Sequence, residues 1–142
     1  MTVKLTSDEM HYRTLFEGIT HARVHDCVID EQGRGVTFVV KKGNIGLAIG
    51  KNGDRIRKVR QMIGKSVEVI EHSDDPIEFL RNTLAPARVK EINIVERDGK
   101  KVAIVVVERE YKGMAIGLKG RKIQKAKKLA QRHHEIHDIS LA

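Results

Sequence analysis

The chain contains an internal repeat, and this repeat limits what the chain can fold into. Residues 46–58, GLAIGKNGDRIRK, return 67 positions later as residues 113–125, GMAIGLKGRKIQK. Upstream, Ala22-Arg23-Val24 returns as Ala87-Arg88-Val89. Two copies in 142 residues predict two small domains of about 70 residues, each near the lower limit for an independent hydrophobic core. We place these domains at residues 1–73 and 74–142.

The positive charge is concentrated in the repeated stretches. The formal net charge is +8. Residues 41–65 hold eight Lys or Arg and one Asp, and residues 109–132 hold nine Lys or Arg and one Glu, so the remainder of the chain is acidic. This distribution favours an anionic partner, either nucleic acid or an acidic membrane surface. A single cysteine, no apolar run of about 20 residues and no signal-peptide pattern favour a soluble cytoplasmic protein.

Each copy is predicted to form an α+β unit of the order αββααβ. A capping box at residues 6–9, TSDE, begins the first helix, and residues 75–78, DPIE, begin its counterpart, which ends before Pro86. Runs of β-branched residues around a polar glycine turn predict hairpins at 28–40 and 94–106, and their nearly continuous apolar second arms are typical of central strands. Cys27, in one hairpin arm, is expected in the core. Closing strands are expected at 67–70 and 136–141. The short joint at 72–75 predicts two units packed as one rigid body.

Two glycine turns are the candidate functional sites. Residues 50–53, GKNG, and 117–120, GLKG, each lie between two predicted helical segments. Glycine lets a backbone turn sharply and approach a ligand without an intervening Cβ. The helix that follows offers unpaired N–H groups and the positive end of its dipole, which suit a phosphate, and Lys51 or Lys119 adds charge. Three apolar residues beside each turn, here called its apolar thread, could form the bottom of a binding groove. They are Leu47, Ile49 and Ile56 in the first copy, and Met114, Ile116 and Ile123 in the second.

Other ligand-binding motifs fit poorly. Gly46 and Gly50 enclose three residues where a Walker A loop needs four, and Asn52 follows Lys51 where Ser or Thr would bind Mg²⁺. The chain has no full G-x-G-x-x-G dinucleotide fingerprint, and its two Tyr and three Phe are too few for the stacking sheet of an RNA-recognition motif. His133 and His137 would share a helical face near His134, but a polar helix end explains these histidines better than a metal site. We therefore expect no metal and no cofactor.

The αββααβ order, with a G-x-x-G turn between its last two helices, resembles the type II KH domain, here as a tandem pair. The joint between the copies is similar to that of the NusA family of transcription elongation and termination factors, in residues 64–79, GKSVEVIEHSDDPIEF, and then in Asn82, Leu84-Ala85-Pro86-Ala87 and Val89. The resemblance covers the chain from about Ala22 onward. Bacterial NusA carries further domains for which this chain has no room, so we expect the short archaeal NusA-like form, which consists of the KH pair alone.

This resemblance implies a protein without enzymatic activity that binds single-stranded RNA in transcription elongation, termination or antitermination. RNA polymerase is the candidate protein partner, and no membrane or small-molecule substrate is expected. An RNA-processing or ribosome-assembly factor using the same KH pair is the alternative. The resemblance places RNA contacts on the two glycine turns, and the residues beside them complete the expected set: Ile49, Gly50, Lys51, Asn52, Gly53, Arg55, Arg57, Lys58, Ile116, Gly117, Leu118, Lys119, Gly120, Arg121, Lys122 and Lys125.

Overall fold

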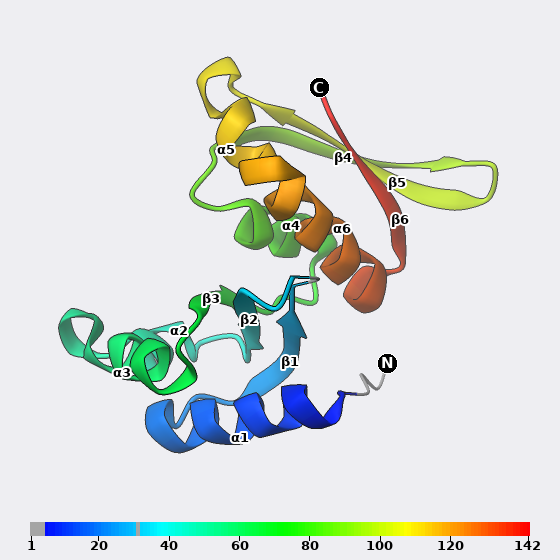
Figure 1. Cartoon of the computed structure of the whole chain (residues 1–142). Helices are drawn as coiled ribbons and strands as arrows, with labels where there is room; N and C mark the ends of the chain where they lie inside the picture. The colour runs from blue at the N-terminus through cyan, green and yellow to red at the C-terminus, as the bar shows by residue number, and fades with distance from the viewer. Residues whose placement is uncertain (1–4, 31) are drawn as a thin grey trace. The chain divides into compact units, whose positions relative to one another are not determined.

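The computed structural model describes residues 5–30 and 32–142. The chain divides into two compact units, with the boundary between Ser73 and Asp74 (Figure 1). Unit 1 contains α1 (Ser7–Thr20), β1 (Val24–Ile29), β2 (Gly35–Val40), α2 (Ile45–Ile49), the short 3-10 turn η1 (Lys51–Gly53), α3 (Asp54–Ile63) and β3 (Ser66–Glu71). Unit 2 contains α4 (Pro76–Leu84), β4 (Val89–Arg97), β5 (Lys100–Val107), η2 (Arg109–Tyr111), α5 (Lys112–Ile116), η3 (Leu118–Gly120), α6 (Arg121–His134) and β6 (Ile136–Leu141). Apart from the short 3-10 turns, both units have the order αββααβ, which confirms the predicted fold class.

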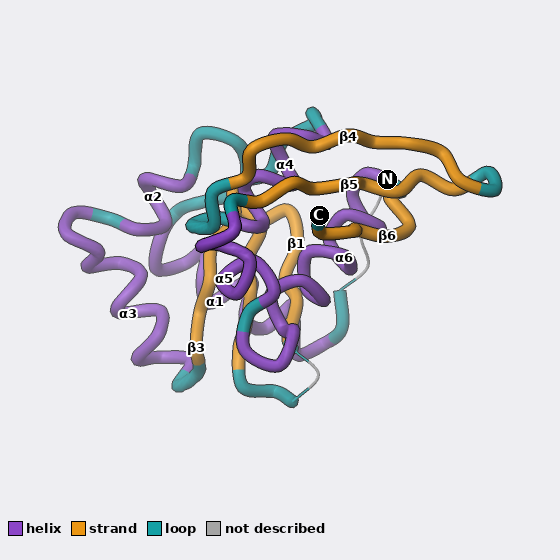
Figure 2. Tube along the Cα trace, turned by 90° about the horizontal axis from the view of Figure 1, so that it is seen from above, coloured by secondary structure: helices purple, strands orange, loops and turns teal. Residues whose placement is uncertain are grey.

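Each unit contains a three-stranded sheet with the second strand of its hairpin at the centre. In unit 1, β2 pairs antiparallel with β1 and parallel with β3. In unit 2, β5 pairs antiparallel with β4 and parallel with β6 (Figure 2). The parallel pair requires the chain to cross over between its strands, and the two helices with their glycine turn form that crossover. The sheet topology therefore places each glycine turn midway along the crossover.

Two helix starts follow the local chemistry of their first residues. The Thr6 hydroxyl accepts a hydrogen bond from the Glu9 N–H at 3.2 Å, and the Glu9 carboxylate accepts one from the Thr6 N–H at 2.9 Å. At the start of α4, the Asp75 carboxylate accepts a hydrogen bond from the Ile77 N–H at 3.0 Å, with Pro76 in the first helical position. These contacts satisfy backbone donors that a helix leaves unpaired at its first turn. They confirm the predicted capping box and the predicted aspartate cap.

The helices of each unit cover one face of its sheet. In unit 1, the ring of Phe16 on α1 stacks on that of Phe38 on β2, with centroids 4.1 Å apart, and Cys27 and Val59 are fully buried in the same cluster. In unit 2, α4 and α6 bury apolar side chains against alternate residues of β5, namely Leu80, Leu84, Ala126 and Ala130 against Ala103, Val105 and Val107. Cys27 is thus a core residue, as predicted.

The two units also share a backbone irregularity, a shift in strand register, that the sequence does not predict. Both hairpins shift register near their beginning, between Val24 and Asp26 in unit 1 and between Val89 and Glu91 in unit 2. The hairpins differ in length, because β4 and β5 have nine and eight residues while β1 and β2 have six each. Asp98 and Gly99 both have positive φ, 53° and 77°, as a two-residue type I′ turn requires.

Candidate nucleic-acid interface

The two glycine turns have the same backbone conformation. Gly50 and Gly117 have φ/ψ of 76°/177° and 79°/173°. Asn52 and Lys119 have 56°/27° and 56°/28°, and Gly53 and Gly120 have 73°/19° and 72°/13°. The middle residues differ completely between the turns, Lys-Asn in one and Leu-Lys in the other. The glycines therefore set the shape of the turn, and its middle side chains do not.

The first glycine of each turn is required for two reasons. Its φ and ψ lie in a region that is essentially restricted to glycine. A Cβ would also strike the next helix: at Gly50 it would lie 2.7 Å from Cγ of Arg55, and at Gly117 it would lie 2.6 Å from Cβ and 2.9 Å from the backbone nitrogen of Lys122. At Gly117 the next helix thus approaches with its backbone, whereas at Gly50 it approaches with the side chain of Arg55.

The second glycine of each turn is required by its backbone angles alone. Gly53 and Gly120 adopt the left-handed conformation directly before α3 and α6. A Cβ on Gly53 would come no nearer than 3.6 Å to another side chain, and one on Gly120 would meet no described atom within 4 Å. Neither helix receives a side-chain cap at its first turn. Backbone N–H groups at such a helix start are suited to an anion, since they carry the positive end of the helix dipole.

Exposed apolar side chains lie immediately before each turn, at matching positions. Leu47 and Ile49 are each 42% exposed, and their counterparts Met114 and Ile116 are 45% and 42% exposed. Ile56 and Ile123, which complete the apolar threads in the sequence, are instead 7% and 8% exposed and belong to the two cores. The surface beside each turn is therefore formed by the short helix before it, and the isoleucine after it anchors the turn.

The basic residues after the first turn have different surroundings. Arg55 donates hydrogen bonds to the backbone carbonyls of Thr20 and Leu47, at 3.1 and 3.2 Å, and so ties α3 to α1 and α2. Arg57 donates to the carbonyl of Asn52 at 2.8 Å and braces the turn itself. Lys51 and Lys58 have exposed side chains. In this turn, two of the four expected basic contacts thus also hold the backbone in place.

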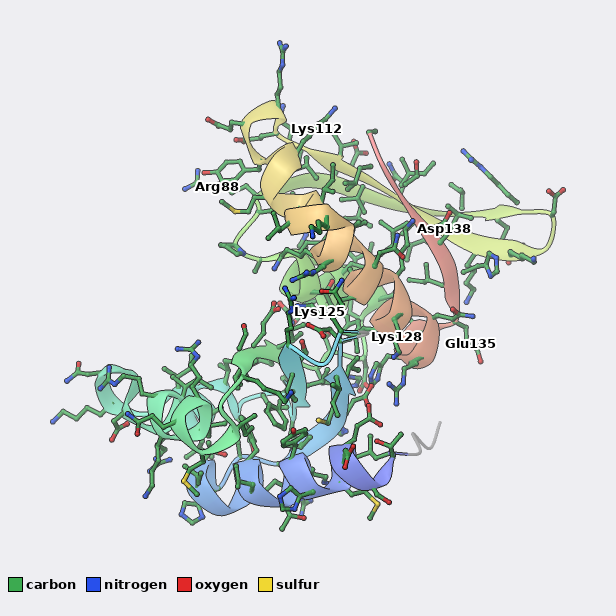
Figure 3. All side chains as sticks on the ribbon, viewed as in Figure 1. Arg88, Lys112, Lys125, Lys128, Glu135 and Asp138 are labelled. Atoms are coloured by element: carbon green, nitrogen blue, oxygen red, sulfur yellow. The ribbon has the colours of Figure 1, made fainter. Side chains whose placement is uncertain are left out.

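After the second turn, the expected basic residues lie partly in the protein surface. Arg121, Lys122 and Lys125 are each half-buried along the first turns of α6. Burial lowers the pKa of Lys122, because a charged ammonium group is poorly solvated there. Figure 3 shows Lys125 and Lys128 projecting from α6, and Lys112 at the start of α5. The basic side chains of the crossover in unit 2 therefore lie along α6, with Lys112 at the start of α5.

Leu47 and Met114 extend the expected set of contact residues. Both belong to the predicted apolar threads and are exposed beside a turn, two positions before Ile49 or Ile116, which alone among the residues of the threads were expected to contact RNA. The signal that identifies them is the repeat itself, since an apolar residue stands at this position in both copies. An exposed apolar residue in one copy is ordinary, whereas its recurrence beside both turns indicates a shared use.

The histidines near the C-terminus do not form the arrangement expected from spacing. Glu135 adopts a left-handed conformation, φ 56° and ψ 30°, which ends α6 at His134. His137 therefore lies on β6, and the prediction that it shares a helical face with His133 is wrong. The rings of His133 and His134 lie 5.2 and 5.1 Å from that of Phe79. Within residues 5–30 and 32–142, no group of three or more His, Cys, Asp or Glu could hold a metal ion.

An ion pair joins β6 to α6 in unit 2. The Lys127 ammonium lies 3.2 Å from the Asp138 carboxylate. The Ile139 N–H also donates a hydrogen bond to that carboxylate, at 2.8 Å. This hydrogen bond, and after it the contact with Lys127, holds the pKa of Asp138 below its usual value.

None of the described helices is long and apolar enough to cross a membrane.

The sheet order, the helical crossover and the glycine turn within it define each unit as a type II KH domain. Residues 11–78 match the KH domain family, and residues 76–142 match the NusA-like second KH domain. The "Probable transcription termination protein NusA" of Methanocaldococcus jannaschii is 35% identical over 98% of this chain and 75% of that protein. The protein of the same name from Halobacterium salinarum is 38% identical over 99% of both chains. The crystal structure of APE1850 superposes with a TM-score of 0.83 at 30% identity, covering 97% of this chain and 100% of that one.

The chain therefore belongs to the archaeal NusA-like family of tandem KH proteins. The predicted family and the predicted pair of KH domains are both confirmed.

Proposed function

We propose that this protein is a non-catalytic NusA-like transcription factor that holds single-stranded RNA at its two glycine turns. The names of its relatives support a role in transcription termination. The observation that carries the proposed RNA contact is the identity of the two turns, which keep the same backbone angles although their middle residues differ. Such agreement is expected where the backbone itself meets a ligand, since phosphate groups are the same along any strand.

Each turn supplies one part of a backbone clamp. A phosphate would lie at the uncapped start of α3 or α6, where helix N–H groups and the dipole favour negative charge. Lys51 in unit 1 and Lys119 in unit 2, both exposed, add a mobile positive charge at that place. A KH domain clamps about four nucleotides in this way.

The exposed apolar pair beside each turn supplies the second part of the clamp. Leu47 and Ile49, or Met114 and Ile116, give the bases an apolar surface close to the bound phosphates. Nucleobases have apolar faces, so their transfer from water onto such a surface is favourable. The chain has few aromatic residues to stack on bases, and aliphatic contacts take their place.

The decisive test places negative charge on the turns. Lys51→Asp with Asn52→Asp, and Leu118→Asp with Lys119→Asp, each keep the glycines and lower the net charge by three. Asp tolerates the left-handed conformation at the second middle position. Either pair should weaken binding of a ten-nucleotide single-stranded RNA at least tenfold, or about 1.4 kcal/mol, because a carboxylate would repel the phosphate.

A matched control separates local repulsion from net charge. Lys100→Asp with Gln131→Glu also lowers the charge by three, on exposed positions of β5 and the last part of α6. This variant should bind RNA like the parent, while circular dichroism and melting temperature remain unchanged in all three proteins. Parent-like RNA binding by both turn variants, with their fold intact, would show that the turns are not clamps.

RNA polymerase is the protein partner that fits a transcription factor of this family. Crosslinking in cells of the source organism, followed by purification of the tagged protein, should recover RNA polymerase subunits. Recovery of a ribosomal subunit instead would assign the same KH pair to ribosome assembly. The binding experiment with isolated RNA is unaffected by this choice, so the RNA contact and the cellular role are tested separately.

A further inference from the structure

Leu118, in the second glycine turn, is the most exposed of the large apolar side chains in the described part of the chain, at 75%. Its counterpart in the first turn is Lys51, which stands on the same backbone conformation. Unit 1 forms the same turn with a lysine at this position, so the backbone conformation does not require an apolar side chain. The leucine therefore has no evident structural role.

The exposed leucine continues an apolar surface. Met114 and Ile116, on α5, are 45% and 42% exposed, so three large apolar residues at alternate positions lie open to solvent in unit 2. The corresponding surface of unit 1 consists of Leu47 and Ile49 and ends at Lys51. Single exposed apolar residues are ordinary on protein surfaces, but three in five residues at a proposed binding turn are not.

The charge around this surface favours a nucleic acid over an apolar protein partner. Residues 109–132 carry nine Lys or Arg and one Glu. Lys119 follows Leu118 directly. Lys112 lies at the start of α5, the short helix that carries Met114 and Ile116 (Figure 3). A leucine side chain cannot hold a phosphate, because it has neither a charge nor a hydrogen-bond donor. In an anionic strand, the parts that suit it are the faces of the bases.

We infer that Leu118 packs against a nucleobase, so that the turn of unit 2 reads a base where the turn of unit 1 holds the phosphate backbone alone. This inference rests on the proposed function and adds an asymmetry to it. Both units would contact bases through the exposed apolar pair before the turn, and unit 2 would add a base contact at the turn itself.

The test isolates unit 2 by starting from the full chain with Lys51→Asp and Asn52→Asp. Into this background we place Leu118→Ala or Leu118→Lys, and as a matched control Met10→Ala, which removes a 57% exposed apolar side chain from α1. Each protein is titrated with two probes: a pool of random ten-nucleotide single-stranded RNAs, and a matched abasic pool with the same backbone in which all ten nucleotides lack a base. Circular dichroism checks the fold of every variant.

Leu118→Ala should weaken binding of the intact pool by about fivefold, the scale set by burying part of a leucine side chain, and should leave binding of the abasic pool unchanged. Leu118→Lys should reduce the difference in affinity between the two pools, and Met10→Ala should change nothing. An equal loss for both pools would overturn the inference, because Leu118 would then act by shaping the turn.

Unchanged RNA binding by the Leu118 variants would also overturn it, and a simultaneous loss of RNA polymerase from the purified complex would assign the apolar surface to a protein contact. Either of these outcomes leaves the proposed function intact, provided that the parent protein binds RNA and the aspartate variants bind it more weakly. If the parent itself fails to bind the intact pool, the proposed function fails and the inference fails with it.

Discussion

Replacing the four glycines of the turns by alanine, one at a time, should produce two clearly different effects on stability. At Gly50 and Gly117 the backbone angles are nearly forbidden to other residues, which costs about 1–3 kcal/mol, and the added Cβ collides with the next helix. The collision at Gly117 involves the Lys122 backbone nitrogen at 2.9 Å, whereas at Gly50 it involves only side-chain atoms of Asp54 and Arg55. We expect Gly117→Ala to cost about 3 kcal/mol or more, with Gly50→Ala somewhat less.

The second glycines should tolerate alanine far better. Gly53 and Gly120 need only a left-handed conformation, which costs alanine about 1–2 kcal/mol, and a Cβ at either position has room. Urea unfolding followed by circular dichroism would give the free energies. Hydrogen exchange of the β2 and β5 amides would assign each loss to its unit. Equal destabilisation by Gly117→Ala and Gly120→Ala would refute the argument that close helix approach, in addition to φ, fixes the first glycine.

Three further predictions concern the salt dependence of RNA binding, the length of the bound RNA and one ion pair. Affinity for single-stranded RNA should fall with salt concentration at a log–log slope of about −4 if roughly six phosphates are neutralised, and a slope near zero in salt titrations would mean that the basic helices only face solvent. The short joint predicts that both turns act on one strand, so a ten-nucleotide RNA should bind far better than one of about five nucleotides in the same fluorescence assay; equal affinities would contradict this. Asp138→Asn should destabilise unit 2 at neutral pH by less than about 1 kcal/mol, since the ion pair is largely exposed. Because the folded-state pKa of Asp138 is lowered, this difference should shrink as pH falls through the acidic range and vanish once the carboxyl group is protonated, as urea melts at several pH values would show.

Most of the fold could be predicted from the sequence because its signals are local and occur twice. The Thr6 and Asp75 caps, the helix end before Pro86 and the apolar central strands each follow from residues a few positions apart. The repeat then allowed each weak signal in one copy to be checked against the other. The closing strands were predicted within one residue of their observed bounds for the same reason.

Contacts between distant segments could not be predicted in this way. The charge of Arg55 beside the turn predicts an RNA contact, and that stays a prediction, whereas its hydrogen bond to Thr20, 35 residues away in sequence, has no local signal. The expected helical face of His133 and His137 was wrong, although a closing strand was expected at 136–141, because Glu135, a residue without a preference for the left-handed conformation, ends α6 in the place that glycine takes in many helices. The joint packing of the two units, and the RNA-contact residues themselves, stay predictions.

The matched backbone of the two turns has a consequence for how such a duplicated protein can change. The glycines on either side fix the path of the backbone, so different residues can occupy the two positions between them. The one restriction is the left-handed backbone conformation at the second of these positions. Asn and Lys already occupy that place, and Lys and Leu occupy the first. Under the proposed function, mutations at these two positions would alter what one unit binds while the cores, the sheets and the other unit remain as they were. A single substitution at the first middle position, such as Leu118→Lys, is therefore the smallest change that would alter the proposed preference of one unit and leave the other as it is.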